Sequence, residues 1–118
     1  MEAYRNPARL FKALMHPGRL AILDVLRDGE QCVCHMEAVL GCRQAYISQH
    51  LAILREAGIV EDRRDGWNIF YRVVKPEVFD LVDQAGQLMG QAKVDSGLPR
   101  TPADCPCPKC SPEAPLVE

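Results

Sequence analysis

The residues with the clearest capacity for chemistry in this chain are its cysteines, and five of the six fall into two groups. Cys32 and Cys34 are two positions apart, and Cys105, Cys107 and Cys110 lie together near the end of the sequence. Clustered thiols that stay reduced bind soft metals or react with oxidants, because the thiolate is both a ligand and a nucleophile. The sequence therefore predicts metal binding or redox sensing at these residues.

The spacing of Cys32 and Cys34 makes their geometry depend on the local backbone. In a regular helix, residues i and i+2 lie about 200° apart around the axis, so two such thiols cannot bind one ion without distortion. In an extended segment the same two side chains share a face. The pair lies where a short helix is expected to begin, and the dipole of a helix N-terminus lowers the pKa of a thiol. We expect ligation to unwind or tilt this first turn; the alternative is that both cysteines are small buried hydrophobes.

The composition is that of one small folded domain, with 118 residues of which 47% are hydrophobic and 25% charged. We find no apolar run typical of a signal peptide or of a membrane span, which predicts a soluble, cytoplasmic protein with reduced thiols. The net charge is −2, but residues 1–75 carry +2 and residues 76–118 carry −4. Since the acidity is concentrated in the C-terminal third, it does not exclude a nucleic-acid partner for the rest of the chain.

The distribution of proline marks a boundary in the chain. Six of the nine prolines lie between Pro99 and Pro115, alongside three of the cysteines. This composition is typical of a tail or arm and not of a continuous core. We therefore expect a folded domain over residues 1–95 and a Pro- and Cys-rich C-terminal tail over residues 96–118.

Apolar periodicity predicts four helices, a β-hairpin and a last helix in the order α-α-α-α-β-β-α. The first helix is expected to begin with Asn6 as N-cap and Pro7 at its first position. The next three are expected over residues 17–27, 32–40 and 43–57. Strands are expected over residues 59–63 and 67–73, joined by a turn at Asp65-Gly66, with Ile69, Tyr71 and Val73 on one face. This order predicts a mainly helical, winged helix-turn-helix fold.

The last predicted helix, over residues 76–92, carries a continuous apolar stripe. This stripe offers more apolar surface than so small a core needs, so part of it is assigned to the interface of a homodimer. The alternative is that the whole stripe packs on the core of its own chain. The expected interface residues are Val78, Leu81, Val82, Ala85, Leu88 and Met89.

Four separated motifs occur in one order along the chain. Residues 14–23 read Leu-Met-His-Pro-Gly-Arg-Leu-Ala-Ile-Leu, and residues 31–36 read Gln-Cys-Val-Cys-His-Met. Residues 48–51 read Ser-Gln-His-Leu, followed by Leu-Arg-Glu-Ala-Gly-Ile-Val over 54–60; residues 63–71 read Arg-Arg-Asp-Gly-Trp-Asn-Ile-Phe-Tyr. Together these motifs, over about residues 7–92, resemble the ArsR/SmtB family of bacterial metal-sensing repressors. The resemblance implies a homodimeric repressor that binds operator DNA and is released by a soft metal or metalloid, namely arsenite, cadmium, lead or zinc.

The ligand set departs from the patterns of that family. Relatives that respond to arsenite supply a third cysteine just after the paired ones, but position 37 is Glu. Relatives that respond to cadmium or lead add cysteines in an N-terminal arm, but none precedes Cys32, and no histidine follows His50 to build a zinc site in the last helix. His35 is a candidate auxiliary ligand, and Cys42 is expected to be a packing residue.

The tail cysteines are therefore the remaining candidate metal ligands. Two thiolates are an incomplete set, since zinc-like ions take four ligands and trivalent arsenic takes three. An extended linker of about 12 residues reaches about 40 Å, enough to bring the tail to either Cys32/Cys34 pair of a dimer. Alternatively, Cys105, Cys107 and Cys110 form a three-thiolate site of their own, or the tail has no function.

The winged helix-turn-helix prediction also selects candidate DNA-binding residues. Glutamine can read adenine edges, serine can bond either base and alanine can contact the thymine methyl. Arginines that flank the recognition helix or approach the wing tip are placed for phosphates. The set is Arg43, Gln44, Ala45, Ser48, Gln49, Arg55, Arg63 and Arg64. The alternative is an ordinary solvated polar face; His50 is expected to be structural, and Tyr46 either contacts phosphate or packs on the core.

A second functional reading uses the same cysteines as a thiol-redox or persulfide switch. In that reading Cys32 and Cys34, or two tail cysteines, oxidise to a disulfide. An enzyme is not expected, because the sequence offers no nucleophile–base pair, phosphate loop or carboxylate pair.

Overall fold

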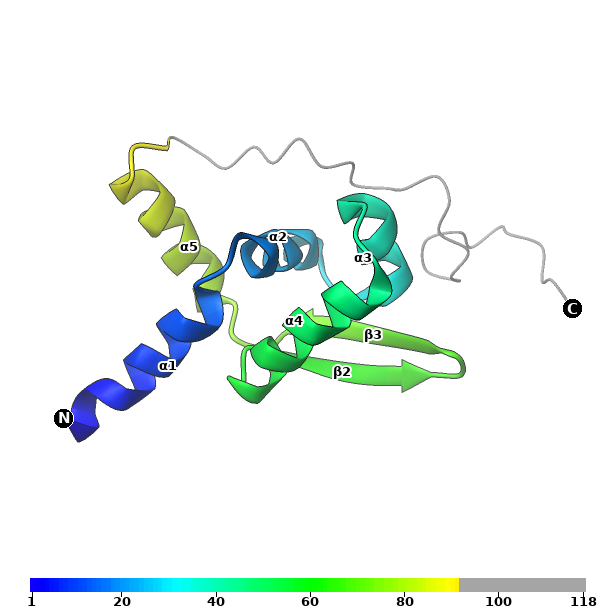
Figure 1. The fold of residues 1–118 in the computed structure, drawn as a ribbon, viewed down its shortest axis with the longest axis horizontal. Coiled ribbons are helices and arrows are strands. Elements are labelled where there is room, and N and C mark those ends of the chain that lie inside the picture. The colour runs from blue at the N-terminus through cyan, green and yellow to red at the C-terminus, as the bar shows by residue number, and fades with distance from the viewer. Residues whose placement is uncertain (92–118) are drawn as a thin grey trace, which may run out of the picture.

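The computed structural model describes residues 1–91 as a mainly helical domain with a three-stranded antiparallel sheet (Figure 1). Two short 3-10 turns, η1 and η2, accompany the helices. The elements in chain order are η1 (Glu2–Tyr4), α1 (Arg5–Leu14), α2 (Pro17–Val25), η2 (Leu26–Asp28), β1 (Gln31–Cys32), α3 (Val33–Leu40), α4 (Gln44–Glu56), β2 (Val60–Asp65), β3 (Asn68–Val73) and α5 (Glu77–Leu88). The predicted winged helix-turn-helix order is confirmed, with β1 as an additional strand.

The helix boundaries follow the local capping chemistry. The side chain of His16 caps α2, because its Nδ1 accepts a hydrogen bond from the backbone N–H of Gly18 at 2.9 Å. The α1 helix begins earlier than predicted, so Asn6 lies inside it and Tyr4 is its N-cap. The α5 helix is shorter than predicted: it ends at Leu88, two residues before Gly90 with its positive φ of 89°.

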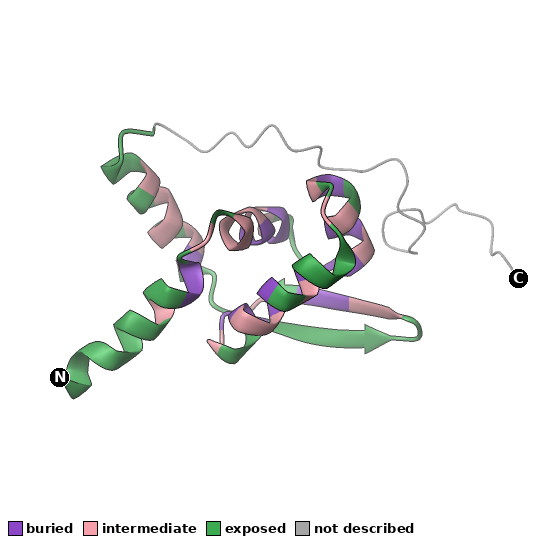
Figure 2. Ribbon diagram, viewed as in Figure 1, coloured by how far each residue is buried: buried purple, intermediate pink, exposed green. Residues whose placement is uncertain are grey.

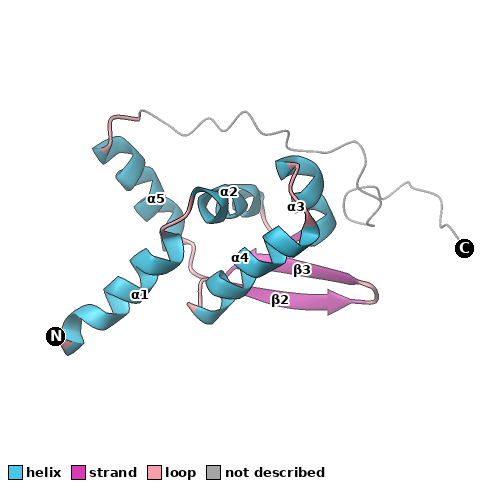
Figure 3. Cartoon of the chain, in the orientation of Figure 1, coloured by secondary structure: helices cyan, strands magenta, loops and turns pink. Residues whose placement is uncertain are grey.

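The sheet has the order β1-β3-β2, and the hairpin β2–β3 is the wing (Figure 3). Asp65 pairs with Asn68, so the turn consists of Gly66 and Trp67 and lies one residue later than predicted. Of these two turn residues Gly66 has a positive φ, 61°, and Trp67 does not, which suits glycine at the first position of a tight hairpin turn. The β1 strand pairs Gln31 with Tyr71 and Cys32 with Phe70.

The core lies between α2, α3, α4 and the sheet (Figure 2). Ile47, Leu51 and Leu54 on the inner face of α4 are fully buried, as predicted. On β3, Ile69, Tyr71 and Val73 contact this core, whereas Phe70 points to the other face and packs with Cys32. Among residues 1–91, none of the helices combines the length and apolar content needed to cross a bilayer.

Candidate DNA-contacting face and thiol pair

The outer face of α4 presents short polar side chains to solvent. Gln44, Ala45 and Gln49 are exposed and Ser48 is half-buried, on the side of the helix opposite the core residues. The helix begins directly after Arg43, which is also exposed. This face therefore offers amide and hydroxyl groups that can bond base edges, with a cation at its N-terminal end.

The four arginines predicted to contact phosphate fall into two pairs. Arg43 and Arg64 have no ion pair with any residue of the described range 1–91. Arg55 lies 3.6 Å from Asp62, a contact between α4 and the wing. Arg63 is held most firmly, since Glu30 accepts from its Nη2 at 2.5 Å and from its Nε at 3.2 Å. Arg43 and Arg64 are thus free to meet a phosphate, whereas Arg63 must first leave Glu30.

A cluster of three rings joins the recognition helix α4 to the start of α2. The ring of His50 lies 4.4 Å from that of His16 and 4.5 Å from that of Tyr46. The hydroxyl of Tyr46 lies over Gly18, where a Cβ atom would approach it to 2.5 Å. Any side chain at residue 18 would therefore displace Tyr46, so this glycine lets α4 pack closely against α2.

Arg19 completes this cluster with three hydrogen bonds. Its Nε donates to Nδ1 of His50 at 3.2 Å, and its Nη1 donates to the carbonyl oxygens of Lys12 and Ala13 at 3.0 Å each. His50 is buried, which agrees with its predicted structural role. The sequence did not reveal the cluster, because its members come from residues 16–19 and 46–50 and share no local pattern.

The stability of the domain is expected to fall at acidic pH through His50. Burial, followed by the charges of His16 and Arg19, lowers the pKa of His50 below its ordinary value of 6.5. Below about pH 6.5 the unfolded chain binds more protons than the folded one, so stability is full above this pH and decreases below it. Urea unfolding at pH 7.5, 6.5 and 5.5 measures the decrease, which a single site limits to about 1.4 kcal/mol per pH unit.

The variant His50→Gln is the control for this titration. It is expected to be less stable at pH 7.5 but to lose less stability between pH 7.5 and 5.5 than the unmodified chain. Parallel pH profiles for the two proteins would contradict the assignment to His50.

Cys32 and Cys34 lie on either side of the boundary between β1 and α3. Cys32 is the N-cap of α3, with extended backbone angles of φ −81° and ψ 161°, and Cys34 is the second residue of the helix. Their Cα atoms are 5.4 Å apart and their sulfurs are joined as a disulfide. Cys32 stands before the helix and Cys34 within it, and their sulfurs meet across this boundary; that ligation unwinds or tilts the first turn stays a prediction.

The thiol pair is in contact with the wing. Cys32, only 1% exposed, packs against the buried ring of Phe70 on β3, and Cys34 packs against the same pair. The guanidinium of Arg63, on β2, lies 4.9 Å from the centre of the Phe70 ring. Glu30, which binds Arg63, is two residues before Cys32. The cysteines are therefore connected to both strands of the wing through van der Waals and ionic contacts.

The described residues hold two of the five predicted metal ligands. Cys105, Cys107 and Cys110 lie outside them, and within residues 1–91 no three His, Cys, Asp or Glu side chains group as a metal site. His35 is buried, and its backbone N–H donates to Sγ of Cys32 at 3.2 Å. Cys42 packs partly buried against the core, as expected.

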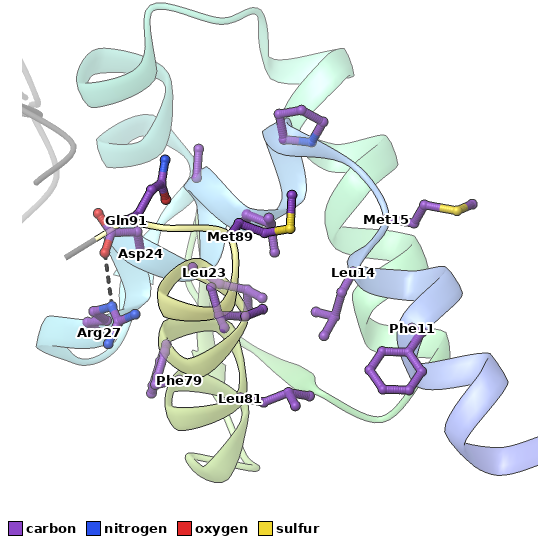
Figure 4. A pocket seen from close by; sticks show the side chains of 16 residues that line it. Phe11, Leu14, Met15, Leu23, Asp24, Arg27, Phe79, Leu81, Met89 and Gln91 are labelled. Carbon is purple, nitrogen blue, oxygen red and sulfur yellow. Dashed lines mark hydrogen bonds and ion pairs between the residues drawn. The ribbon is translucent and has the colours of Figure 1, made fainter. Parts of the chain in front are cut away.

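An apolar groove of about 810 Å³ lies between α1, α2 and α5 (Figure 4). One side of the groove is lined by Phe11 of α1 and by Met15, the C-cap of that helix. The other side is lined by Leu81 and Met89. Arg27, in η2, joins α5 to α2, since it binds Asp24 of α2 at 2.9 Å and Asp83 of α5 at 2.5 Å and lies over the ring of Phe79.

The residues predicted to form the dimer interface fall into two groups, those at this groove and one that is buried in the core. Leu81, Val82, Ala85 and Met89 line it, and Leu88 is 86% exposed beside it. Val78, by contrast, is buried in the core of its own chain and is not available to a partner.

This chain is similar in sequence to known regulatory proteins. The model of a family described as "Bacterial regulatory protein, arsR family" matches residues 16–62. An uncharacterized HTH-type transcriptional regulator of Methanocaldococcus jannaschii is 46% identical over 89 residues, which cover 71% of this chain and 99% of that one. The biofilm growth-associated repressor of Agrobacterium fabrum is 45% identical over 76 residues, which cover 64% of this chain and 65% of that repressor. The arsenic resistance transcriptional regulator of Pseudomonas putida is 44% identical over 84 residues, which cover 70% and 65%.

Two solved structures have the same fold. The transcriptional repressor BigR from Xylella fastidiosa matches with a TM-score of 0.66 and 40% identity, covering 79% of this chain and 95% of that one. A homodimeric winged helix-turn-helix DNA-binding domain from Mycobacterium bovis, a possible ArsR-family regulator, matches with a TM-score of 0.66 and 31% identity, covering 77% and 89%.

Proposed function

Because this chain belongs to the arsR family of bacterial regulatory proteins, we propose that it is a homodimeric repressor of transcription that a thiol-binding effector releases from double-stranded operator DNA. The effector is a soft metal or metalloid, namely arsenite, cadmium, lead or zinc, bound as thiolate complexes by Cys32 and Cys34. The observation that carries this proposal is the meeting of the two sulfurs at the start of α3, against the wing. The arsenic resistance regulator among the relatives supports a metalloid.

In this proposal the outer face of α4 lies in the major groove. Gln44 and Gln49 bond adenine edges, Ser48 bonds a base and Ala45 contacts a thymine methyl. Arg43 and Arg64 bind phosphates that fix the register of the helix on the duplex. Two copies of the chain related by a two-fold axis would then read two half-sites about one helical turn apart.

Removing Gln49 and removing Arg64 are expected to weaken DNA binding in different ways. Gln49→Ala removes base contacts and is expected to lose about 1–3 kcal/mol of discrimination between an operator and an unrelated duplex. Arg64→Ala removes a phosphate contact, so it is expected to weaken binding to both duplexes and to lower the salt slope by about one. Fluorescence anisotropy across a salt series measures both quantities.

The duplex for this experiment is one enriched from a random-sequence pool by the purified full chain; it is called the selected duplex below. An unselected duplex of equal length is the reference. If both variants bind both duplexes like the unmodified chain, this face of α4 and the wing do not contact DNA.

The pair supplies two of the ligands that the effector needs. At the N-terminus of α3 the helix dipole favours the thiolate form of both residues, which is the form that binds soft ions. Since trivalent arsenic takes three thiolates, the third would come from Cys105, Cys107 or Cys110. The chain would thus supply all three thiolates of trivalent arsenic, and no thiol from another molecule would be needed.

Truncation after Ser96 tests this part of the proposal. The shortened chain keeps Cys32 and Cys34, so it is expected to bind the selected duplex normally but to need about tenfold more effector for release. The measurement is the arsenite concentration that releases half of the bound duplex. An unchanged concentration would remove the tail cysteines from the site.

Coupling between the pair and DNA would run through the wing as well as through α4. A bond formed at Cys32 shifts it against Phe70, and this ring supports Arg63 on the neighbouring strand. Release of Arg63 from Glu30 would change how the wing meets the duplex. Such coupling between two sites is commonly worth about 1–3 kcal/mol.

A thiol-redox switch is the second candidate, and the observation that favours it is the disulfide between Cys32 and Cys34. In this reading the two thiols give two electrons and two protons to hydrogen peroxide. A sulfur–sulfur bond forms, the oxygen–oxygen bond breaks and two water molecules leave. No third ligand is needed.

One titration separates the two candidates. The reduced chain, bound to the selected duplex under anaerobic conditions, is titrated with As(III), Cd(II), Pb(II) and Zn(II), and thiolate absorption and duplex release are followed together. Release by an ion with matching absorption supports the metal or metalloid effector. Release by peroxide alone supports the redox switch, and retention of the duplex under every condition would overturn both.

A further inference from the structure

Two histidines that pack together between α2 and α4 both use Nδ1 as a hydrogen-bond acceptor. Nδ1 of His50, on α4, accepts from Nε of Arg19 at 3.2 Å, and Nδ1 of His16, the N-cap of α2, accepts from the backbone N–H of Gly18 at 2.9 Å. The two rings lie 4.4 Å apart. A protonated imidazole carries a hydrogen on both nitrogens and cannot accept a hydrogen bond, so these contacts require both rings to be neutral.

The charged group that faces His50 is a cation. From α2, His50 faces the guanidinium of Arg19 and the ring of His16, and from its own helix it faces the ring of Tyr46. Two backbone carbonyl oxygens of α1 hold Arg19 in place. Within residues 1–91 no Asp or Glu forms an ion pair with Arg19 or with either histidine. A proton on His50 would therefore remove the hydrogen bond from Arg19 and place one cation against another.

Tyr46 connects His50 to the face of α4 that is proposed to read DNA. Tyr46 lies one helical turn before His50, with the ring centres 4.5 Å apart, and it is 38% exposed, at the border between the core side and the outer face. Its hydroxyl lies close to α2, since a Cβ atom at Gly18 would come within 2.5 Å of it. Ala45, next to it, and Gln49, three residues further on, belong to the proposed base-reading set. Because closely packed side chains move together, a shift of His50 away from α2 would move Tyr46 and tilt this face.

We propose that His50 is a positioning residue that makes DNA binding depend on pH: its neutral ring holds α4 against α2 in the orientation that reads the operator, and one proton from solvent at Nδ1 releases that orientation. This inference rests on the proposed DNA binding. Burial, followed by the charges of His16 and Arg19, lowers the pKa of His50 below 6.5, so the neutral form predominates at neutral pH. The chain would accordingly leave DNA on acidification without any reaction at Cys32 or Cys34.

The expected pH dependence is opposite to that of simple charge attraction. Protonation of histidines makes a protein more positive, which by itself strengthens binding to phosphates. At acidic pH the state that binds DNA carries one proton fewer at His50 than the free state, so affinity is full above about pH 6.5 and falls below it. One site limits this fall to about tenfold per pH unit. Weaker binding on acidification therefore points to the histidine and not to overall charge.

Fluorescence anisotropy of the selected duplex, titrated with the reduced full chain at pH 7.5, 6.5, 5.5 and 5.0 and at constant ionic strength, measures this dependence. The unmodified chain is expected to bind about three- to tenfold more weakly at pH 5.0 than at pH 7.5. His50→Asn keeps an acceptor for Arg19 and gains no proton, so its affinity is expected not to fall. His16→Asn keeps a capping oxygen for α2, and this matched control is expected to retain the fall. Circular dichroism at each pH verifies that every protein is folded.

Proton NMR of the unmodified chain supplies a readout that needs no variant. The sequence has three histidines, so the imidazole signal of His50 can be assigned and titrated. Since coupling between two binding events is reciprocal, DNA that favours the neutral ring must lower the pKa of His50. The ring is therefore expected to titrate at a lower pH in the complex with the selected duplex than in the free chain.

The outcomes distinguish this inference from the proposed function. If the chain binds the duplex at pH 7.5 but the affinity does not fall on acidification, or falls equally in His50→Asn, the inference is wrong and DNA binding stands. A fall that disappears in His16→Asn and persists in His50→Asn would assign the proton to His16 and likewise overturn it, as would an unchanged pKa of His50 in the complex. If no duplex can be selected, both proposals fail.

Discussion

Replacing Cys32 and Cys34 together with serine is expected to give a repressor that binds the selected duplex but no longer releases it. Serine preserves the size of both side chains approximately but forms no bond to soft ions and no disulfide. The coupling between effector and DNA, about 1–3 kcal/mol or about 5–150-fold in affinity, should therefore disappear. The measurement is the dissociation constant for the duplex with and without As(III), and with and without peroxide.

Cys42→Ser is the matched control for this variant. Its thiol is free and packs partly buried near the core, away from the pair. We expect it to respond to the effector like the unmodified chain. A double Cys32/Cys34 variant that still releases DNA at the same effector concentration would show that the sensing thiols lie elsewhere. Thermal unfolding of both variants separates loss of response from loss of fold, since Cys32 is buried against Phe70.

Placing a charge in the groove beside α5 is expected to abolish dimerisation and with it most of the affinity for DNA. Met89 lines the groove but is 82% exposed, so Met89→Asp adds a charge there without opening the core. Together with Phe11→Asp on the opposite wall, it would place two carboxylates from each protomer, four in all, in the dimer interface. Because two linked half-sites gain about 10²–10⁴ in affinity over one, the monomer should bind the selected duplex at least about 100-fold more weakly.

Sedimentation velocity and anisotropy check the two parts of this prediction. Gln84→Glu, on an exposed position of α5 outside the groove, is the control and is expected to remain dimeric. A Phe11/Met89 double variant that sediments as a dimer would move the interface away from the groove. A monomer that still binds the duplex tightly would contradict the requirement for two half-sites.

The sequence predicts those parts of the fold that local pattern specifies. Helical periodicity places α2, α3 and α4 to within a few residues, because each buries one apolar face and ends at a glycine or a capping residue. The wing is predicted from period-two alternation, but its turn is not: Asp65-Gly66 is a strong turn signal, whereas cross-strand pairing of Asp65 with Asn68 places Gly66 and Trp67 in the turn.

Features that depend on long-range pairing cannot be predicted from local pattern. The β1 strand has two residues, too few for any periodicity, and exists because β3 binds it. Arg63 is predicted to contact a phosphate, but in the folded chain it forms an ion pair with Glu30. Because these two residues are 33 positions apart, no local pattern in the sequence predicts this ion pair. The same holds for His16, Tyr46 and His50, whose rings meet because Gly18 leaves room for the tyrosine.

Cys32 and Cys34 are unequally exposed, which would give the reaction of the two proposed sensing thiols an order. Cys34 is partly exposed and Cys32 is almost inaccessible, so an incoming reagent meets Cys34 first. A monofunctional reagent such as an alkylating agent forms its only bond there and leaves Cys32 untouched against Phe70. A reagent that can form a second bond to sulfur would next react with Cys32, which packs against Phe70 of the wing. Under the proposed function, this difference in burial would make release of DNA selective for reagents that form bonds to both sulfurs over those that form only one.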